Sequence, residues 1–135
     1  MKILTRETDY AVRVLVALAL TGEPFTSAKT LAHDLSMPYP FLRLLLQSLV
    51  KAGIVQSKEG ARGGVRLAKE PNGITLEHII DVFQGEINFS GCIFKAKKCG
   101  NFGSCVLRRR LQPIEKNLRE SFASVSVQDL VNDLK

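Results

Sequence analysis

The stretch TSAKTLAHDLSMPYPFLRLLLQSLVKAGIVQSKEGARGGVRL, residues 26–67, decides the fold. Its first residues can cap a short helix, and the turn at residues 36–40 must end that helix because two prolines this close cannot lie inside one. Apolar residues at helical spacing then predict a longer helix over residues 41–52. Two short β-type segments follow, at residues 54–58 and 65–67, joined by a glycine-rich stretch. Helix, turn, helix and hairpin is the order of a winged helix-turn-helix.

The rest of the chain surrounds this unit with further helices. Residues 5–20 have apolar positions at helical spacing, and Thr75 can cap another helix that ends near Phe83. A long amphipathic helix follows the cysteines, and Pro113 should kink or restart it. Its apolar stripe is made of Leu107, Leu111, Ile114, Leu118 and Phe122. A short helix over residues 127–134 closes the chain. We therefore expect a mainly α-helical fold with a small β-hairpin wing.

Composition and charge narrow the class of protein. The 135 residues contain 19 Lys and Arg against 13 Asp and Glu, so the net charge is +6 and the pI is about 9.5. This basic balance favours an anionic partner. No apolar run approaches the roughly 20 residues that span a bilayer, so we expect no membrane association. The cysteine count is 3, whereas secreted disulfide domains usually have even counts, so we expect a cytoplasmic location.

Polar residues on the longer helix and on the wing indicate binding to double-stranded DNA. Arg43 and Gln47 stand one turn apart, and they could read base edges in the major groove because Arg pairs well with guanine and Gln with adenine. Gly63 and its neighbouring glycines would let the wing backbone approach the duplex. The alternative is that Arg43, Gln47 and Lys51 form an ordinary solvated helix face. Phosphate and sugar contacts are expected from Thr26, Ser27, Tyr39, Lys51, Lys58, Arg62 and Arg66.

Three cysteines lie in a glycine-containing stretch without periodicity. Cys92, Cys99 and Cys105 have the pattern C-x6-C-x5-C. This spacing differs from the C-x2-C of common structural zinc sites, and three thiolates in one loop fit an iron–sulfur cluster. Lysines and arginines surround the pattern, and their charge would offset that of a thiolate-bound cluster. Two alternatives to a cluster stay open. The three cysteines could be free thiols, either unrelated to one another or acting as a redox switch, or they could bind zinc.

Over essentially its whole length, the sequence resembles the IscR/NsrR (Rrf) family of iron–sulfur winged-helix regulators. The wing together with the cysteine loop is specific to that family, and the first segment is supportive. The resemblance implies a homodimeric transcription factor with one cluster per subunit, dimerised through the long helix after the cysteines. It also implies that the state of the cluster alters affinity for operator DNA. The matching segments are LTRETDYAVR at residues 4–13, FL at 41–42, KAGIV at 51–55, GARGGVRL at 60–67 and the three cysteines.

The fourth ligand of the cluster differs among members of that family. In the branch that controls cluster assembly, a histidine follows the third cysteine by three residues, and this chain has Arg108 there. In the nitric-oxide-sensing branch, the aspartate of the leading Thr-Asp motif binds a 4Fe–4S cluster of the partner subunit, and Asp9 matches it. The resemblance thus implies Asp9 as a ligand, with Glu7 behind it, and a 4Fe–4S cluster in preference to 2Fe–2S. The alternative is that Asp9 caps the first helix or forms a salt bridge there.

These observations divide the chain into three expected parts. Residues 1–84 form the winged helix-turn-helix DNA-binding domain, residues 85–105 the cluster-binding cysteine loop, and residues 106–135 the dimerisation helix with a C-terminal helix. The expected function is a repressor whose affinity for DNA changes with redox state, nitric oxide or iron–sulfur status. An enzyme with a nucleophilic cysteine is disfavoured because no Cys–His motif is evident. A cluster carrier without DNA binding would leave the basic wing unexplained.

Overall fold

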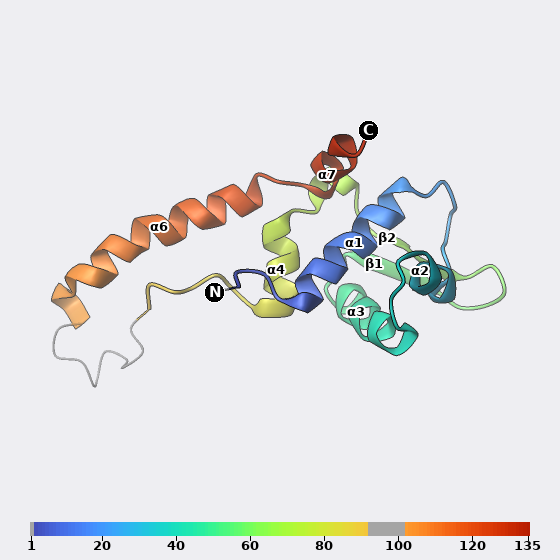
Figure 1. The fold of residues 1–135 in the computed structure, drawn as a ribbon, viewed down its shortest axis with the longest axis horizontal. Coiled ribbons are helices and arrows are strands. Elements are labelled where there is room, and N and C mark those ends of the chain that lie inside the picture. The colour runs from blue at the N-terminus through green and yellow to red at the C-terminus, as the bar shows by residue number, and fades with distance from the viewer. Residues whose placement is uncertain (1, 92–101) are drawn as a thin grey trace.

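The computed structural model describes residues 2–91 and 102–135, and Figure 1 shows their arrangement. The helices α1 to α4, the hairpin and α7 form one body, and α6 extends away from it. The predicted mainly α-helical fold with a hairpin wing and a long C-terminal helix is confirmed. The elements are α1 (Arg6–Leu20), α2 (Ala28–Asp34), α3 (Tyr39–Lys51), β1 (Val55–Lys58), β2 (Gly64–Leu67), the 3-10 turn η1 (Pro71–Gly73), α4 (Leu76–Gln84), the 3-10 turn η2 (Phe102–Ser104), α6 (Val106–Ala123) and α7 (Val127–Asp133).

The hydrophobic core is built around α1. Val14 and Leu15 of this helix are completely buried, and α4 and α7 contribute Ile79 and Val127. Burying a side chain of this size contributes roughly 1.5–3 kcal/mol. Helix α7 comes last in the sequence but packs against α1, so the two ends of the chain close one core (Figure 1). The side of α3 that was predicted to face inward is buried, and it consists of Leu42, Leu45, Leu46 and Leu49.

Helix α3 begins earlier than the sequence predicts. The predicted turn over residues 36–40 ends at Pro38, which is the N-cap residue, and Pro40 lies in the first turn of the helix. A proline is tolerated there because the first N–H groups of a helix have no partner within it. The shift adds Tyr39 to the helix and leaves its apolar register unchanged.

The wing consists of β1, β2 and the residues between them. The strands pair antiparallel, with Gln56 opposite Arg66. The chain just before α2 adds to this hairpin, because the Thr26 N–H donates to the Val65 carbonyl at 2.9 Å and the Val65 N–H to the Thr26 carbonyl at 2.8 Å. Gly64 stands beside this pairing with a φ of +143°. The backbone of the wing is thus fixed to the start of the helix-turn-helix.

Helix α6 is continuous, so the predicted restart at Pro113 is wrong. Pro113 has no N–H to donate to the carbonyl of Arg109, four residues earlier. Both residues are exposed, so water can bind that carbonyl instead. The predicted apolar stripe is only partly covered by the chain itself, since Leu107 is 64% and Ile114 is 55% exposed. None of the described helices combines the length and the apolar character that crossing a membrane requires.

The close approach at Gly64 generates a prediction about stability. A Cβ on Gly64 would lie 2.3 Å from the Thr26 carbonyl oxygen, and the positive φ is itself unfavourable for other residues. Gly64→Ala should therefore lower the free energy of unfolding by more than about 1 kcal/mol, measured by urea denaturation. Gly22→Ala is the matched control because a Cβ there meets nothing within 4 Å. Equal stability of the two variants would contradict the packing of Thr26 on the wing.

Candidate nucleic-acid interface and cysteine-loop stem

Four of the predicted DNA contacts lie on one face of α3. Tyr39, Arg43, Gln47 and Lys51 follow one another at intervals of four residues, which places them on one side of the helix. Together with Ser57 of β1, they line a hollow of about 370 Å3 that we call the α3 groove, and no acidic residue is among its lining residues. The opposite side of α3 is buried in the core. The packing of the core therefore turns the polar face of α3 outward.

The cations of α3 and the wing are exposed, and none of them forms an ion pair with a described carboxylate. Arg43, Lys51, Lys58, Arg62 and Arg66 are all exposed. Within residues 2–91 and 102–135, none of them forms an ion pair with a carboxylate, although ion pairs occur on α1 and α6. The structure thus presents a positive surface along α3 and the wing that an external anion could neutralise.

An aromatic ring lies against the first of these cations. The Arg43 guanidinium carbon is 5.9 Å from the centre of the Tyr39 ring. Tyr39 is itself 37% exposed. A cation–π contact of this kind orients the guanidinium without neutralising it. The hydrogen-bonding groups of Arg43 therefore remain suited to reading a base edge.

Three other predicted DNA contacts have roles within the fold. The Thr26 hydroxyl is buried and has no hydrogen-bond partner among the described residues, so it is not available to a phosphate in this conformation, contrary to our expectation. Ser27 is the N-cap of α2, and its hydroxyl accepts the Thr30 N–H at 3.1 Å. A Cβ on Gly63 would lie 2.0 Å from the Lys58 carbonyl oxygen, so the turn inside the wing already requires glycine there.

Leu44 is a candidate contact that the sequence analysis missed. It is 63% exposed on α3, between Arg43 and Gln47 in the sequence. An exposed apolar side chain on such a face could contact the methyl group of thymine. The exposure of Leu44 could have been predicted from its position, because it falls outside the buried stripe of α3 that begins with Leu42 and Leu45. It went unnoticed because it lies within a run of leucines.

Of the three cysteines, Cys105 can be placed, and Cys92 and Cys99 lie outside the described residues. Cys105 is the N-cap residue of α6, and its Sγ accepts the backbone N–H of Arg108 at 3.4 Å. The positive end of a helix dipole favours negative charge at this position, which suits a thiolate. Among the side chains that the structure describes, no group of three His, Cys, Asp or Glu residues is arranged to hold a metal ion.

Asp9 occupies the exposed side of the first part of α1. Its carboxylate forms an ion pair with Arg13, one turn further along the same helix, with an N–O distance of 3.1 Å. Both side chains are more than half exposed, at 52% and 60%, and such pairs contribute only about 0.3–0.5 kcal/mol. The structure therefore contains the salt bridge that was the alternative to a ligand role, and this bridge is weak enough for a stronger partner to displace.

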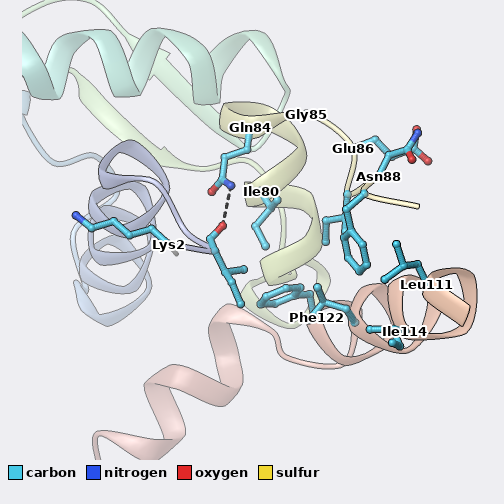
Figure 2. A pocket seen from close by; sticks show the side chains of 13 residues that line it. Lys2, Ile80, Gln84, Gly85, Glu86, Asn88, Leu111, Ile114 and Phe122 are labelled. Atoms are coloured by element: carbon cyan, nitrogen blue, oxygen red, sulfur yellow. Dashed lines mark hydrogen bonds between the residues drawn. The ribbon is translucent and has the colours of Figure 1, made fainter. Parts of the chain in front are cut away.

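An apolar groove lies between α4, α6 and residues 85–89, with Lys2 and Ile3 also at its wall. We call residues 85–91 the loop stem because they lead toward Cys92. Its volume is about 550 Å3. Figure 2 shows Ile80 of α4 together with Ile114 and Phe122 of α6 around this space. The apolar stripe of α6 from Leu111 to Phe122 and the end of α4 therefore share one apolar surface in this groove.

Two charged side chains of α6 hold the loop stem. The Glu115 carboxylate accepts the backbone N–H groups of Phe89 at 2.8 Å and Ser90 at 2.7 Å. Arg119 donates to the Ile87 carbonyl oxygen and pairs with Glu115 at 3.3 Å. The pKa of Glu115 is held below its ordinary value, chiefly by hydrogen bonds from Ser90. The hydrogen bond from Phe89 and the charge of Arg119 also lower this pKa, whereas desolvation of the carboxylate opposes them. The stem is thus fixed to α6 by a charge-assisted clamp.

Gln84 connects the same region to the beginning of α1. Its side-chain oxygen accepts the Thr5 N–H at 3.0 Å and the Thr8 hydroxyl at 2.7 Å. Its amide nitrogen donates to the Ile3 carbonyl at 2.9 Å, which is the dashed line in Figure 2. Thr8 is buried and precedes Asp9 directly. One residue at the end of α4 therefore positions the segment that contains the candidate ligand Asp9.

Comparison with known proteins supplies the class of protein. The family model Rrf2, described as an iron-dependent transcriptional regulator, matches residues 4–133. The HTH-type transcriptional regulator NsrR of Shouchella clausii is 28% identical over 134 residues, which are 97% of this chain and 87% of NsrR. Among solved structures, CymR, the global cysteine regulator of B. subtilis, superposes with a TM-score of 0.79 at 28% identity and covers 98% of both chains. T. potens IscR gives 0.77 at 29% identity, over 100% of this chain and 89% of IscR. These are names of transcriptional regulators and not of enzymes, in agreement with the sequence analysis.

The Glu115 clamp predicts an acid-sensitive contribution to stability. Because the pKa of Glu115 is lowered in the folded protein, its contribution is complete above the ordinary pKa of 4.5 and is lost as the pH falls through the folded value. Glu115→Gln should lower the urea midpoint near pH 7, and its difference from wild type should shrink at pH values below about 4.5.

Hydrogen exchange gives a local readout of the same contact. In Glu115→Gln, the amides of Phe89 and Ser90 should exchange faster than in the wild type, because a neutral acceptor holds them less strongly. Glu120→Gln is the matched control on α6, since the ion pair that the described residues give Glu120 is an exposed one with Lys116 at 4.0 Å. Unchanged exchange at Phe89 and Ser90 in Glu115→Gln would contradict the clamp.

Proposed function

Because the chain belongs to the Rrf2 family of transcriptional regulators, we propose that it is a homodimeric repressor that inserts one α3 helix into the major groove of each operator half-site. The observation that carries this proposal is the exposed cationic face of α3 and the wing, which has no acidic partner among the described residues. Phosphates would supply the missing negative charge.

The residues around the α3 groove would divide into those that recognise bases and those that bind phosphates. Arg43 and Gln47 lie at the middle of the exposed face, and both carry the paired hydrogen-bonding groups that recognise guanine and adenine edges. Leu44 adds an apolar contact beside them. Lys51 at the end of α3 and Lys58 on the wing would contact phosphates.

The remaining predicted contacts fit around this arrangement. Ser27 at the N-terminus of α2 and Tyr39 at the N-terminus of α3 would approach the sugar-phosphate backbone. Arg62 at the wing tip and Arg66 on β2 would extend the contact beyond the major groove. Thr26 is left out of this set because its hydroxyl is buried.

The uncovered apolar stripe of α6 supports dimerisation through this helix. Leu107 and Ile114 are more than half exposed in a helix that the body of the chain leaves largely uncovered. The groove beside it, with Ile80 and Phe122, offers an apolar surface that the α6 of a second copy would cover. We therefore keep the division into a DNA-binding domain at residues 1–84, a sensor loop at 85–105 and a dimerisation part at 106–135.

We propose that the sensor is an iron–sulfur cluster held by Cys92, Cys99 and Cys105, with Asp9 of the partner subunit as fourth ligand. The donor set is suitable, since three thiolates in one loop are typical of such clusters and Cys105 sits at a helix N-terminus that favours its charge. When bound, a 4Fe–4S or 2Fe–2S cluster would supply reactivity toward oxidants or nitric oxide. The chain would transmit the change through Glu115, which holds the loop stem to α6, and through Gln84.

A second candidate keeps the DNA-binding dimer and changes the sensor. The three cysteines would then act as a thiol redox switch or bind zinc. CymR and IscR superpose on this chain about equally well, with TM-scores of 0.79 and 0.77, so structural likeness alone does not favour the cluster over this alternative. The ion pair between Asp9 and Arg13 also supports it, because that pair gives Asp9 a role without a metal.

Substitutions on α3 test the DNA interface. Arg43→Ala and Gln47→Ala should each weaken binding to a duplex selected from random sequences by the wild type, by about 1–3 kcal/mol. The loss should be smaller on a mixed-sequence duplex, because base contacts carry specificity. Lys135→Ala, which removes one positive charge beyond α7, should leave both affinities nearly unchanged. Fluorescence anisotropy at two salt concentrations measures these effects, and a wild-type protein without salt-sensitive binding would overturn the proposal.

Anaerobic purification tests the sensor. The protein should be brown, with broad visible absorption and with iron and sulfide bound, and Cys105→Ser should lose most of the colour and iron. Asp9→Asn should retain less iron than the wild type, whereas Asp34→Asn, another exposed acid in a weak pair, should retain the same amount. Colourless, iron-free protein after anaerobic reconstitution would overturn the cluster. Zinc analysis and thiol titration would then decide between the two forms of the alternative.

A further inference from the structure

We propose that Phe25 is a positioning residue for DNA binding, whose ring orients Lys58 and Arg66 on the outer face of the wing toward phosphates that flank the α3 contact. The Arg66 guanidinium carbon is 4.7 Å and the Lys58 ammonium nitrogen is 5.5 Å from the centre of the Phe25 ring. This inference rests on the proposed DNA-binding function and adds a residue to it.

Backbone pairing explains why these side chains meet. Thr26 is bridged antiparallel to Val65, so Phe25 stands opposite Arg66, one residue along. Across the hairpin, Arg66 is paired with Gln56. Because side chains alternate between the faces of a strand, Phe25, Arg66 and Gln56 share one face with Lys58. That face is turned away from the core.

The other face of the wing shows the same alternation. Val55 and Val65 are buried there, at 2% and 6% exposure. Val65 and Ser57 also line the α3 groove. The cations on the outer face therefore point to a different part of the duplex from the one that α3 would read.

Phe25 has no comparable role in the hydrophobic core. Among the described residues, Phe41 and Phe83 pack against the core cluster, whereas Phe25 is not part of that packing. It is half-buried on the wing, and both of its cation–π contacts are with wing residues. An aromatic ring at this position is thus explained by the cations that it supports.

The contacts of Arg66 leave part of its guanidinium free for an anion. Its Nε donates to the Gln56 side-chain oxygen at 3.0 Å, and the Phe25 ring lies against the group. Within the part of the chain that the structure describes, its two Nη groups have no hydrogen-bond partner, and Arg66 forms no ion pair with a carboxylate. A guanidinium held in this way loses little conformational freedom when it binds a phosphate.

Affinity for a mixed-sequence 30-base-pair duplex tests the proposal, because phosphate contacts do not depend on sequence. Phe25→Leu should weaken binding about three- to tenfold at low salt. Phe25→Tyr and Phe25→Trp keep a ring and should bind within about twofold of the wild type. Thermal unfolding followed by circular dichroism confirms that each variant is folded, and Phe25→Met serves as a second ring-free variant.

A double-mutant cycle separates positioning from a general structural effect. In the Lys58→Gln/Arg66→Gln background, Phe25→Leu should cause no further loss of affinity, because the cations it orients are already gone. Arg66→Gln alone should lower the salt slope by about one. A full extra loss in that background, or wild-type affinity of folded Phe25→Leu, would overturn the inference while leaving the α3 interface standing. Absence of salt-dependent binding by the wild type would overturn both.

Discussion

The packing of one side of α3 against the core is the constraint on which the rest of this structure depends. Leu42 and Leu49 are completely buried, and this fixes the rotation of the helix about its axis. A helix fixed in that way must expose its other side, so Arg43 and Gln47 need no interaction of their own to face outward. The wing is added on the same side through the backbone pairing of Thr26 with Val65. The candidate interface is therefore a consequence of how the core is filled.

The parts of the fold that repeat with a regular period could be predicted from the sequence. Apolar residues of α3 recur with the helical period because burial does, and the inward set of leucines is as predicted. The prolines were less informative. Pro40 lies in the first turn of α3, and Pro113 lies inside α6. A proline removes one backbone N–H, and the cost of that loss depends on what the carbonyl four residues earlier can bind instead, which the local sequence does not show.

Contacts between segments that are distant in the sequence could not be predicted. Nothing in the local pattern indicates that Gln84 bonds to Thr8, 76 residues away, or that Glu115 accepts the N–H of Ser90. The enclosed hydroxyl of Thr26 is a similar case, since its burial depends on how the wing closes over it. For the candidate sensor, the iron–sulfur cluster that the spacing of the cysteines indicates stays a prediction. The structure adds the position of Cys105 and the two side chains, Glu115 and Arg119, that hold the loop stem.

The uncovered stripe of α6 bears on how such a regulator responds to its own abundance. If Leu107 and Ile114 are covered only by a second copy, assembly obeys mass action, and the dimer population rises with the square of protomer concentration while dimers are scarce. If the dimer is the form that binds an operator with two half-sites, as proposed, then operator occupancy would rise more steeply than the number of chains. Small changes in synthesis or dilution during growth would then have a larger effect on transcription than proportional control would give.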